Sequence, residues 1–386
     1  MDIVAFDPLI HRSRWDEFIV ASYRNANYVL LSDTFLRWQF LDNPANQTGN
    51  YTLWLIEQKG EIIAQLGFVP FDGIAASGEA IRGAYPINLM VRPAYQSVGL
   101  GAILLARLLK QFPCLVNPGV NEAGAALGEG LGMTNLGFLR RYVAVLDKHA
   151  AQPLAFNGRL PQGVVEAEAR LVDVIAATKL PPQAAAGFAL PQRVHGAIRD
   201  SDFLRWRYET HPAFAYEFLF SGDYHSVLVF HEERETGTGA LILRVVDMLA
   251  RPEHQLALLS GVVFAGKERG AAIIDFYCSL DCYQPALRAA GFFDEAMHSD
   301  SHIAELFQPL DFRRTGTRVL ASCPGWSGTR LEDWYITKAD SDRTISVRSK
   351  RSGKCDTGPL TAESKKFLVR RRLARAATPT VCSHPV

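Results

Sequence analysis

The sequence predicts an α/β protein, in which each sheet is mixed as in α+β folds. It consists of two similar halves that follow one another along the chain. Apolar strand-like runs alternate with helix-period runs, as in folds that pack helices on a sheet. The same order of elements occurs twice. A glycine-rich turn between a strand and a helix occurs in the first copy only, which predicts that the two halves differ in function.

An internal repeat supports the division into halves. The segment FLRW at 35–38 recurs as FLRW at 203–206, and RPAYQ at 92–96 recurs as RPEHQ at 251–255. Two matches in the same order and at nearly the same offset indicate a duplicated unit. The tryptophans of the first match stand at equivalent positions, which favours a shared role in packing over ligand stacking.

The first half is expected to begin with an aromatic helix and to continue as a sheet with crossover helices. Proline after the aromatic helix marks its end, and alternating apolar runs mark the strands. The expected elements are a helix at 35–40, strands at 51–56 and 62–68, a strand ending at Val91, a helix at 103–110, a strand at 112–116 and a helix ending near 132–133.

The second half repeats this order, and further segments flank it. Its expected elements are a helix at 203–208 and strands at 215–220, 226–230 and 271–277. We expect a helix at 164–176 and a final strand and turn at 334–342. The resulting domains are 1–149, a linker at 150–189, 190–342, and a basic tail at 343–386 that we expect to be disordered because it shows little periodicity.

Composition and charge exclude several classes of protein. The chain has 386 residues, of which 48% are hydrophobic and 21% charged, as in ordinary globular proteins of two domains. A net charge of +1 argues against a dedicated nucleic-acid binder. No signal peptide and no run of roughly 18–20 apolar residues is present, so we expect no membrane span and a cytoplasmic location.

The six cysteines predict neither a disulfide framework nor a metal site. So few cysteines in so long a chain are not typical of disulfide-stabilised proteins. Cys278 and Cys282 lie near each other, but no second Cys or His pair with zinc-like spacing accompanies them. We therefore expect no bound metal.

The turn at 96–102 has the physical properties of an anion-binding loop. It joins the strand that ends at Val91 to the helix at 103–110. The N-terminus of a helix exposes backbone N–H groups and carries partial positive charge, so it binds phosphate without a basic side chain. Gly99 and Gly101 allow close approach to the backbone. The alternative, a purely structural strand–helix connection, remains open at this point.

These residues resemble the GNAT superfamily of acyl-CoA-dependent N-acyltransferases. The turn QSVGLGA at 96–102 fits the pattern Q/R-x-x-G-x-G/A directly after a strand. Asn121, after the next strand, matches a further family position, and Gly132-Met133 resembles the Gly-Phe at the end of the following helix. The resemblance covers residues 1–146 and, through the repeat, about 190–310. It implies two tandem GNAT-like domains.

The resemblance also implies the donor substrate, which is acetyl-CoA or another short acyl-CoA. In this fold the strand before the motif separates from its neighbour, so that the backbone of Met90 and Val91 would pair with the pantetheine amides. The amides of the turn would hold the pyrophosphate; these residues are Gln96, Ser97, Val98, Gly99, Leu100, Gly101 and Ala102.

The second copy departs from the family pattern. After RPEHQ comes LALL at 256–259, with no glycine where Gly99 and Gly101 stand in the first copy. Side chains there would shield the backbone amides. We therefore predict one functional cofactor site, in the first half, and a degenerate second half that contributes structure or a wall of the acceptor cleft.

The usual catalytic residues of the family are missing. Many members keep a tyrosine as general acid in the helix before the Gly-Phe, but that position is Gly128 here and Leu287 in the second copy. A glutamate base often stands near the end of the separated strand, but that position is Asn88, with Asp247 as its counterpart. Direct transfer of the family's acid and base to this chain therefore fails.

Three other residues near the expected cleft are candidates for catalysis: Asn88, Tyr85 and Asn121. Asparagine can position a water or a substrate but cannot act as a base, and tyrosine is a potential acid that is also common in strand packing. Asn117 and Glu122 are further candidates near the cleft. The histidines of the second half, His211 and His225, are expected in turns or at the surface.

The leading function predicted from the sequence is transfer of an acyl group from acyl-CoA to a primary amine of a small molecule or an amino sugar. The alternative is a non-catalytic acyl-CoA sensor or scaffold, because the usual acid and base are missing. A transferase that uses aminoacyl-tRNA is disfavoured, since such a donor does not require the intact pyrophosphate motif. We expect no nucleic-acid partner; assembly into a homo-oligomer stays open.

Overall fold

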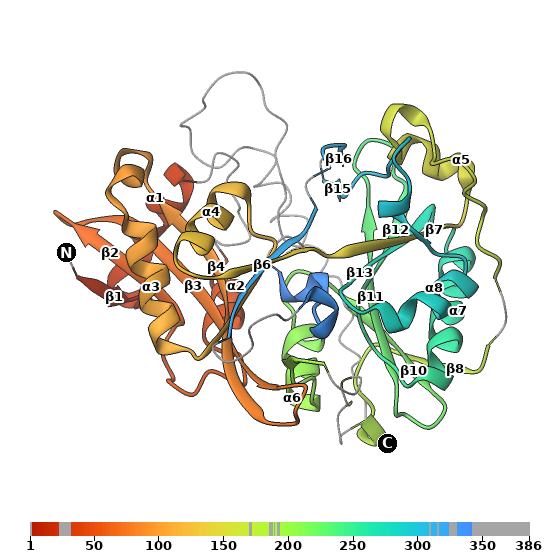
Figure 1. Ribbon diagram of the computed structural model, residues 1–386, viewed down its shortest axis with the longest axis horizontal. Helices are drawn as coiled ribbons and strands as arrows, with labels where there is room; N and C mark the ends of the chain where they lie inside the picture. Colours follow the sequence, from red (N-terminus) through yellow and green to blue (C-terminus); the bar gives the residue numbers. More distant parts are fainter. Residues whose placement is uncertain are drawn as a thin grey trace, which may run out of the picture.

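The computed structural model describes residues 2–22, 32–169, 172–184, 188, 190, 194–308, 310–314, 316–323 and 330–341. Two mixed β-sheets lie side by side, each covered by helices, and the chain crosses from one to the other between β6 and β7 (Figure 1). The predicted fold class, a mixed α/β protein, is confirmed.

The first sheet contains most strands of the N-terminal half. Its order is β1-β2-β3-β4-β5-β17-β6, with β9 paired to β3. Most neighbours are antiparallel, whereas β4 and β5 are parallel. The strands are β1 (Ile3–Ala5), β2 (Leu53–Gln58), β3 (Glu61–Ile74), β4 (Ala80–Val91), β5 (Cys114–Pro118), β6 (Thr134–Phe138), β9 (Gly196–Ala197) and β17 (Arg318–Ser322).

The second sheet repeats this plan with strands of the C-terminal half. Its order is β14-β7-β13-β12-β11-β10-β8, and its parallel pair is β12 and β13. The strands are β7 (Arg140–Val145), β8 (Val174–Ala177), β10 (Tyr216–Ser221), β11 (Val227–Arg234), β12 (Leu241–Leu249), β13 (Ile273–Cys278) and β14 (Phe293–Asp294). A separate hairpin joins β15 (Leu306–Phe307) to β16 (Leu310–Asp311).

The helices follow the predicted alternation with strands. Polar N-caps start several of them: Ser32 accepts a hydrogen bond from the Phe35 N–H, and Asn121 accepts one from the Gly124 N–H. The helices are α1 (Pro8–Ser22), α2 (Asp33–Phe40), α3 (Leu100–Gln111), α4 (Glu122–Gly130), α5 (Lys148–Ala151), α6 (Ser201–Leu204), α7 (Pro252–Glu268) and α8 (Gln284–Ala289). One π-helical turn, Arg205–Glu209, extends α6.

Two expected elements differ from the structure. The helix expected at 164–176 is wrong: residues 164–169 form no helix, and Val174–Ala177 is the edge strand β8, paired with β10. Its alanines suit a helix equally well, but the open edge of the second sheet supplies hydrogen-bond partners. The expected strand at 334–337 is an extended segment with single bridges to His195 and Cys278. The tail at 343–386 lies outside the described residues.

The two sheets exchange strands. β7 comes from the N-terminal half but lies between β13 and β14 of the second sheet. In return, β17 comes from the C-terminal half and lies between β5 and β6 of the first sheet. The contiguous ranges 1–149 and 190–342 therefore do not coincide with the two sheets, because a local sequence pattern does not specify which sheet a strand joins.

The repeated tryptophans meet where the two halves touch. The Trp38 indole N–H donates to the Trp206 carbonyl at 2.7 Å, and the Trp206 indole N–H donates to the Trp38 carbonyl at 2.8 Å. Their rings stack with centroids 5.3 Å apart and an interplanar angle of 20°. The contact is reciprocal, since each tryptophan makes the same hydrogen bond to the other. The two rings pack against each other, in agreement with the packing role expected for them.

A disulfide joins the exchanged strand to the first sheet. Cys114 at the start of β5 is bonded to Cys323, the residue after β17. The cysteine count did not predict it, since the partners are 209 residues apart in the sequence and meet only because β17 enters the first sheet. Cys278 and Cys282 are free thiols.

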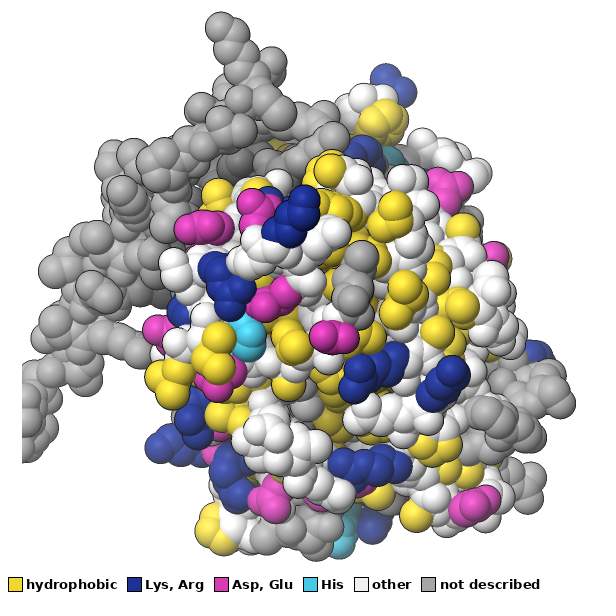
Figure 2. All heavy atoms as spheres, turned by 90° about the vertical axis from the view of Figure 1, so that its left-hand side faces the viewer, with side chains coloured by type: hydrophobic (Ala, Val, Ile, Leu, Met, Phe, Trp, Pro, Cys, Tyr) yellow, Lys and Arg dark blue, Asp and Glu magenta, His cyan; other side chains and the backbone are white. Residues whose placement is uncertain are grey.

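Charged side chains of both signs are scattered over the face of the N-terminal half. Figure 2 shows Lys and Arg side chains interspersed with Asp and Glu, with hydrophobic side chains between them. Such a mixed face lacks the field of one sign that draws nucleic acids to a surface. Within the described residues, no helix is both long and apolar enough to cross a membrane.

A buried cluster of charged side chains lies on three strands of the second sheet, β7, β12 and β13. The Asp275 carboxylate receives hydrogen bonds from Arg141 at 2.9 Å and from Arg244 at 3.0 Å. Lys338 lies near this cluster, 6% exposed, with its Nζ 4.3 Å from the Tyr277 ring centroid. Burial lowers the pKa of Lys338 to about 7; Arg244 and Arg141 lower it further, while Asp275 opposes them.

We expect Lys338→Met to stabilise the protein most below about pH 7. Between the folded pKa of about 7 and the unfolded value of 10.5, the unfolded chain binds more protons. Wild-type stability therefore rises with pH over that interval, and the burial penalty is complete below it. Urea unfolding should show a variant advantage on the order of 3 kcal/mol at pH 6 that shrinks towards pH 9. The exposed Lys148→Met is the control; an advantage independent of pH would contradict the prediction.

Candidate functional site

The parallel strands β4 and β5 separate along their length. They are paired only at Gly83 with Cys114 and at Ala84 with Leu115, while β4 continues to Val91. Beyond this point β5 pairs with β17 on its other side. The edge of β4 that faces β5 therefore has no strand neighbour from 85 to 91 among the described residues.

A β-bulge shapes this open edge at Asn88. Gln65 of β3 pairs with Met90 and Gly67 pairs with Ile87, so two residues of β4 lie opposite one of β3. Asn88 has a φ of 52°, which is uncommon outside glycine. The bulge reverses the side-chain alternation, so Tyr85 and Ile87 share one face of the sheet with Met90.

A buried glutamine holds the bulge in place. The Gln65 side chain donates to the Asn88 carbonyl at 3.1 Å and accepts from the Trp15 indole N–H at 2.6 Å. Gln65 is 1% exposed, so these bonds are shielded from water. Helix α1 therefore fixes the backbone of β4 through Trp15 and Gln65, next to the open edge.

The glycine-rich turn forms a compact link between β4 and α3. Residues Pro93–Val98 form a 3₁₀ helix, and Gly99 then adopts a left-handed φ of 78° as the N-cap of α3. This conformation suits glycine because it lacks a Cβ. The first N–H groups of α3 have no partner within the helix and lie beside the exposed turn.

Gly101 keeps the space between α3 and β4 open. A Cβ at this position would lie 3.4 Å from Leu127 Cδ2 and 3.8 Å from both Leu89 Cδ2 and Val91 Cγ2. These side chains mark the end of the separated strand. The turn, the start of α3 and the edge of β4 thus meet at one place, where a phosphate at the helix N-terminus could continue into an extended chain along β4.

The equivalent space in the second half is filled by tyrosines. β12 and β13 are paired up to Val245 with Phe276, but the backbone of Met248 beyond that point bonds to side chains. The Met248 N–H donates to the Tyr335 hydroxyl at 3.1 Å, and the Met248 carbonyl accepts from the Tyr283 hydroxyl at 2.7 Å. These hydroxyls occupy the backbone groups that a ligand would use.

Asp247, the counterpart of Asn88, belongs to a buried charge network. Its carboxylate accepts from the Tyr208 hydroxyl at 2.7 Å and also from the Tyr335 hydroxyl. Arg199 lies 3.4 Å from Asp247 and donates to both oxygens of Asp340 at 2.7 and 2.8 Å. Burial raises the pKa of Asp247 despite Arg199. Asp247 therefore binds side chains of its own half and, among the described residues, has no open space for a ligand beside these bonds.

The structure brings two of the three catalytic candidates onto one strand. Tyr85 lies on β4, 5% exposed, and Asn88 forms the bulge three residues further on. Burial raises the pKa of Tyr85 well above its usual value, and the neighbouring Asp340 carboxylate, which shares a hydrogen bond with it, raises it further. Tyr85 therefore keeps its proton at neutral pH.

The remaining candidates lie on β5, at the start of α4 and in the second half. Asn121 is exposed and caps α4 by accepting a hydrogen bond from the Gly124 N–H at 2.8 Å. Asn117 lies on β5 opposite Leu320 of β17, and Glu122 is the exposed first residue of α4. His225 is exposed in a turn, as expected, whereas His211 packs 4.3 Å from the Trp38 ring.

The comparison with protein families agrees with this geometry. Residues 10–122, which contain β2 to β5 with the bulge and the glycine turn, match the model of the acetyltransferase (GNAT) family. This part of the N-terminal half is therefore similar to a GNAT acetyltransferase domain. The second half, with its filled gap, lies outside the matched residues. No curated protein matches the chain.

A solved structure with a similar fold covers most of the chain. A GCN5-related N-acetyltransferase from Anabaena variabilis is 13% identical with a TM-score of 0.51, and the match covers 83% of this chain and 72% of that one. One from Kribbella flavida is 15% identical with a TM-score of 0.49, covering 83% and 70%. At this identity, the likeness to the Anabaena protein concerns the fold, and it extends over both halves.

Several residues of the site gave no signal in the sequence. Gln65 and Trp15 hold the bulge of β4, and Tyr335 fills the second gap; all three act through contacts between distant segments. The counterpart relation between Asn88 and Asp247 was the one available hint of the buried network. Among the described residues, no group of three or more His, Cys, Asp or Glu could hold a metal ion.

Proposed function

We propose that the protein transfers an acyl group from acetyl-CoA, or another short acyl-CoA, to a primary amine of a small molecule or amino sugar. The observation that carries this proposal is the open edge of β4 beyond Ala84, which contains a bulge and ends at the glycine turn. Acyl-CoA supplies an activated thioester. The protein then has to orient the thioester towards the amine and provide a path for the proton that the amine loses.

The residues of the first half fit such a donor. The turn, from Gln96 through Ser97, Val98, Gly99, Leu100 and Gly101 to Ala102, would hold the pyrophosphate through its backbone amides. The backbone of Met90 and Val91 would pair with the pantetheine. The Val91 carbonyl already points away from β3, since the Gln96 side chain donates to it at 3.3 Å.

The proposed proton donor is Tyr85, and Asn88 and Asn121 would position the reacting groups. A tyrosine that stays protonated can protonate the departing thiolate, whereas an asparagine can orient the amine or a water. Nucleophilic attack by the amine nitrogen forms the amide bond, the C–S bond breaks, and the nitrogen loses its proton to solvent. The bulge directs backbone N–H groups to the developing oxyanion.

The donor site is tested by Gly101→Leu. A leucine here would enter the space beside Leu89 and Val91, while the helix itself tolerates it. We expect acetyl-CoA affinity, measured by isothermal titration calorimetry, to fall at least about 100-fold with the melting temperature preserved. Gly99→Leu should act similarly but with strain, because φ is 78°.

Gly130→Leu is the matched control, since Gly130 ends α4 and a Cβ there would have no described atom within 4 Å. It should bind acetyl-CoA as the wild type does. Undiminished binding in Gly101→Leu would refute the placement of the donor.

A non-catalytic acyl-CoA sensor is the second candidate function. It is favoured by the glycine at 128, where many family members carry the acid. The two functions separate in a thiol-release assay with a panel of amines: tight acetyl-CoA binding without release of CoA for any amine would support the sensor, and amine-dependent release would support the transferase.

A further inference from the structure

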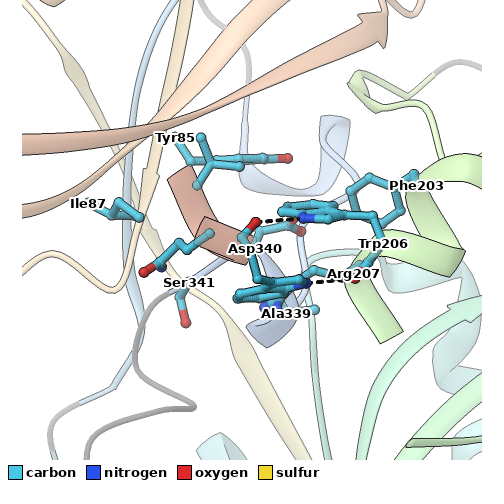
Figure 3. A pocket seen from close by; sticks show the side chains of 11 residues that line it. Tyr85, Ile87, Phe203, Trp206, Arg207, Ala339, Asp340 and Ser341 are labelled. Atoms are coloured by element: carbon cyan, nitrogen blue, oxygen red, sulfur yellow. Dashed lines mark hydrogen bonds between the residues drawn. The ribbon is translucent and has the colours of Figure 1, made fainter. Parts of the chain in front are cut away.

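A pocket lies between the two halves, on the face of β4 turned away from α3. Figure 3 shows Tyr85 and Ile87 on one side and Phe203 and Trp206 on the other. Both halves contribute to its wall, which comprises Trp38, Gln39, Val69, Tyr85, Ile87, Phe203, Trp206, Arg207, Ala339, Asp340 and Ser341. Ile87 directly precedes the bulge, so the pocket ends about one strand residue, roughly 3.3 Å, from Asn88.

The aromatic wall of this pocket is rigid and apolar. The indole N–H groups of Trp38 and Trp206 donate to each other's carbonyls, so neither is left to bind a ligand. Phe203 packs on Trp206 with centroids 5.7 Å apart. The wall therefore offers ring surface, which suits a flat carbon group.

One polar atom of the wall lacks a partner. Gln39 is 5% exposed. Its side-chain oxygen Oε1 is buried and accepts no hydrogen bond from the described residues. An unpaired buried acceptor is costly, and a ligand N–H would satisfy it. Gln39 comes from α2 and lines the pocket beside Trp38.

The charged groups of the wall are already engaged. Both oxygens of Asp340 accept from Arg199, and one also accepts from the Thr337 N–H at 3.0 Å. Arg207 donates to the Ala339 carbonyl. The wall therefore does not suit a ligand with a carboxylate, a phosphate or several hydroxyls. Such groups would lose their hydrogen bonds to water on binding and gain no partners in the wall.

We propose that this pocket binds the acceptor, and that the acceptor is a primary amine attached to a flat apolar group, such as an arylalkylamine. The inference rests on the proposed transferase function and selects among its acceptors. Gln39 receives a hydrogen bond from the amine, and the ring lies along the aromatic wall. The amine nitrogen attacks the acyl carbon, the C–S bond breaks, the sulfur gains a proton and the nitrogen loses one.

Binding of amines tests the pocket without turnover. 2-Phenylethylamine, phenylalanine and glucosamine are titrated by calorimetry into the full-length protein without acetyl-CoA. We expect saturable binding of 2-phenylethylamine, and binding at least tenfold weaker for phenylalanine, which adds a carboxylate, and for glucosamine, which adds hydroxyls. Equal or tighter binding of glucosamine would overturn the inference, as would no saturable binding of 2-phenylethylamine.

Gln39→Leu tests the unpaired acceptor. The substitution should weaken the binding of 2-phenylethylamine about tenfold, which is the effect expected from the loss of one hydrogen bond. Gln58→Leu is the matched control, because Gln58 Oε1 is also buried and unpaired among the described residues but lies outside the pocket wall. Equal affinity of Gln39→Leu and wild type, with unchanged melting temperature, would refute the role of Gln39.

The outcome also separates this inference from the proposed function. If acetyl-CoA binds and glucosamine is acetylated in preference to 2-phenylethylamine, the transferase stands and the acceptor class is wrong. If acetyl-CoA itself fails to bind while 2-phenylethylamine binds with the expected selectivity, the donor assignment fails and the pocket remains.

Discussion

Residues 1–149 expressed alone are expected not to form a stable native domain. The fragment lacks β17, which lies between β5 and β6 and pairs with both. It also carries β7, whose residues from Arg141 to Val145 are buried in the second sheet. An unfilled position in one sheet and an unpaired apolar strand favour aggregation. Circular dichroism and heat-induced unfolding should show no cooperative transition.

Co-expression with residues 150–386 is the control, because the two fragments together contain every strand of both sheets. We expect the pair to co-purify and to unfold cooperatively. Residual association could also be followed through the bond between Cys114 and Cys323, which joins the two fragments. A cooperative transition of 1–149 alone, near the melting temperature of the whole chain, would contradict the strand exchange.

The repeat and the local patterns were sufficient to predict the architecture of each half. FLRW and RPAYQ recur with the aromatic helix and the long strand in the expected places, since local hydrophobic periodicity decides these elements. The exchange of β7 and β17 could not be predicted, because both are short apolar strands whose choice of sheet depends on global pairing. The segment of β8 was predicted to be helical for a similar reason, because its own sequence does not indicate that it pairs with β10 at the edge of the second sheet.

The proposed donor site was easier to predict from the sequence than the proposed acceptor site. A glycine turn needs backbone amides and space, and both are encoded in a contiguous segment, Pro93–Val98 with Gly99 and Gly101. The proposed acceptor pocket joins α2, β4 and the segment Lys338–Asp340, which are more than 200 residues apart at the extremes. Gln39 and Asp340 carry no local motif, so only the folded arrangement brings them together.

Arg199→Met should destabilise the protein by about 3–5 kcal/mol, because it removes the cation between two buried carboxylates. Arg199 is fully buried, with Asp247 at 3.4 Å and Asp340 at 2.7 Å. Methionine fills much of the same volume, so the loss would report charge and hydrogen bonds. Urea unfolding at pH 7 gives the free energy. The exposed Arg205→Met, which removes only surface ion pairs such as that with Asp202, should cost less than about 1 kcal/mol.

The pH dependence of the Arg199→Met deficit identifies its electrostatic origin. Without the guanidinium, the pKa of Asp247, which burial already raises, shifts further upward, so the folded variant binds protons at a higher pH than the unfolded chain does. The variant's deficit should therefore narrow as the pH falls from 7 to 5, and Asp247→Asn in the same chain should recover part of it at pH 7. A deficit that stays constant with pH and is unaffected by Asp247→Asn would instead assign the loss to packing, and would remove the argument that Arg199 stabilises the fold by charge.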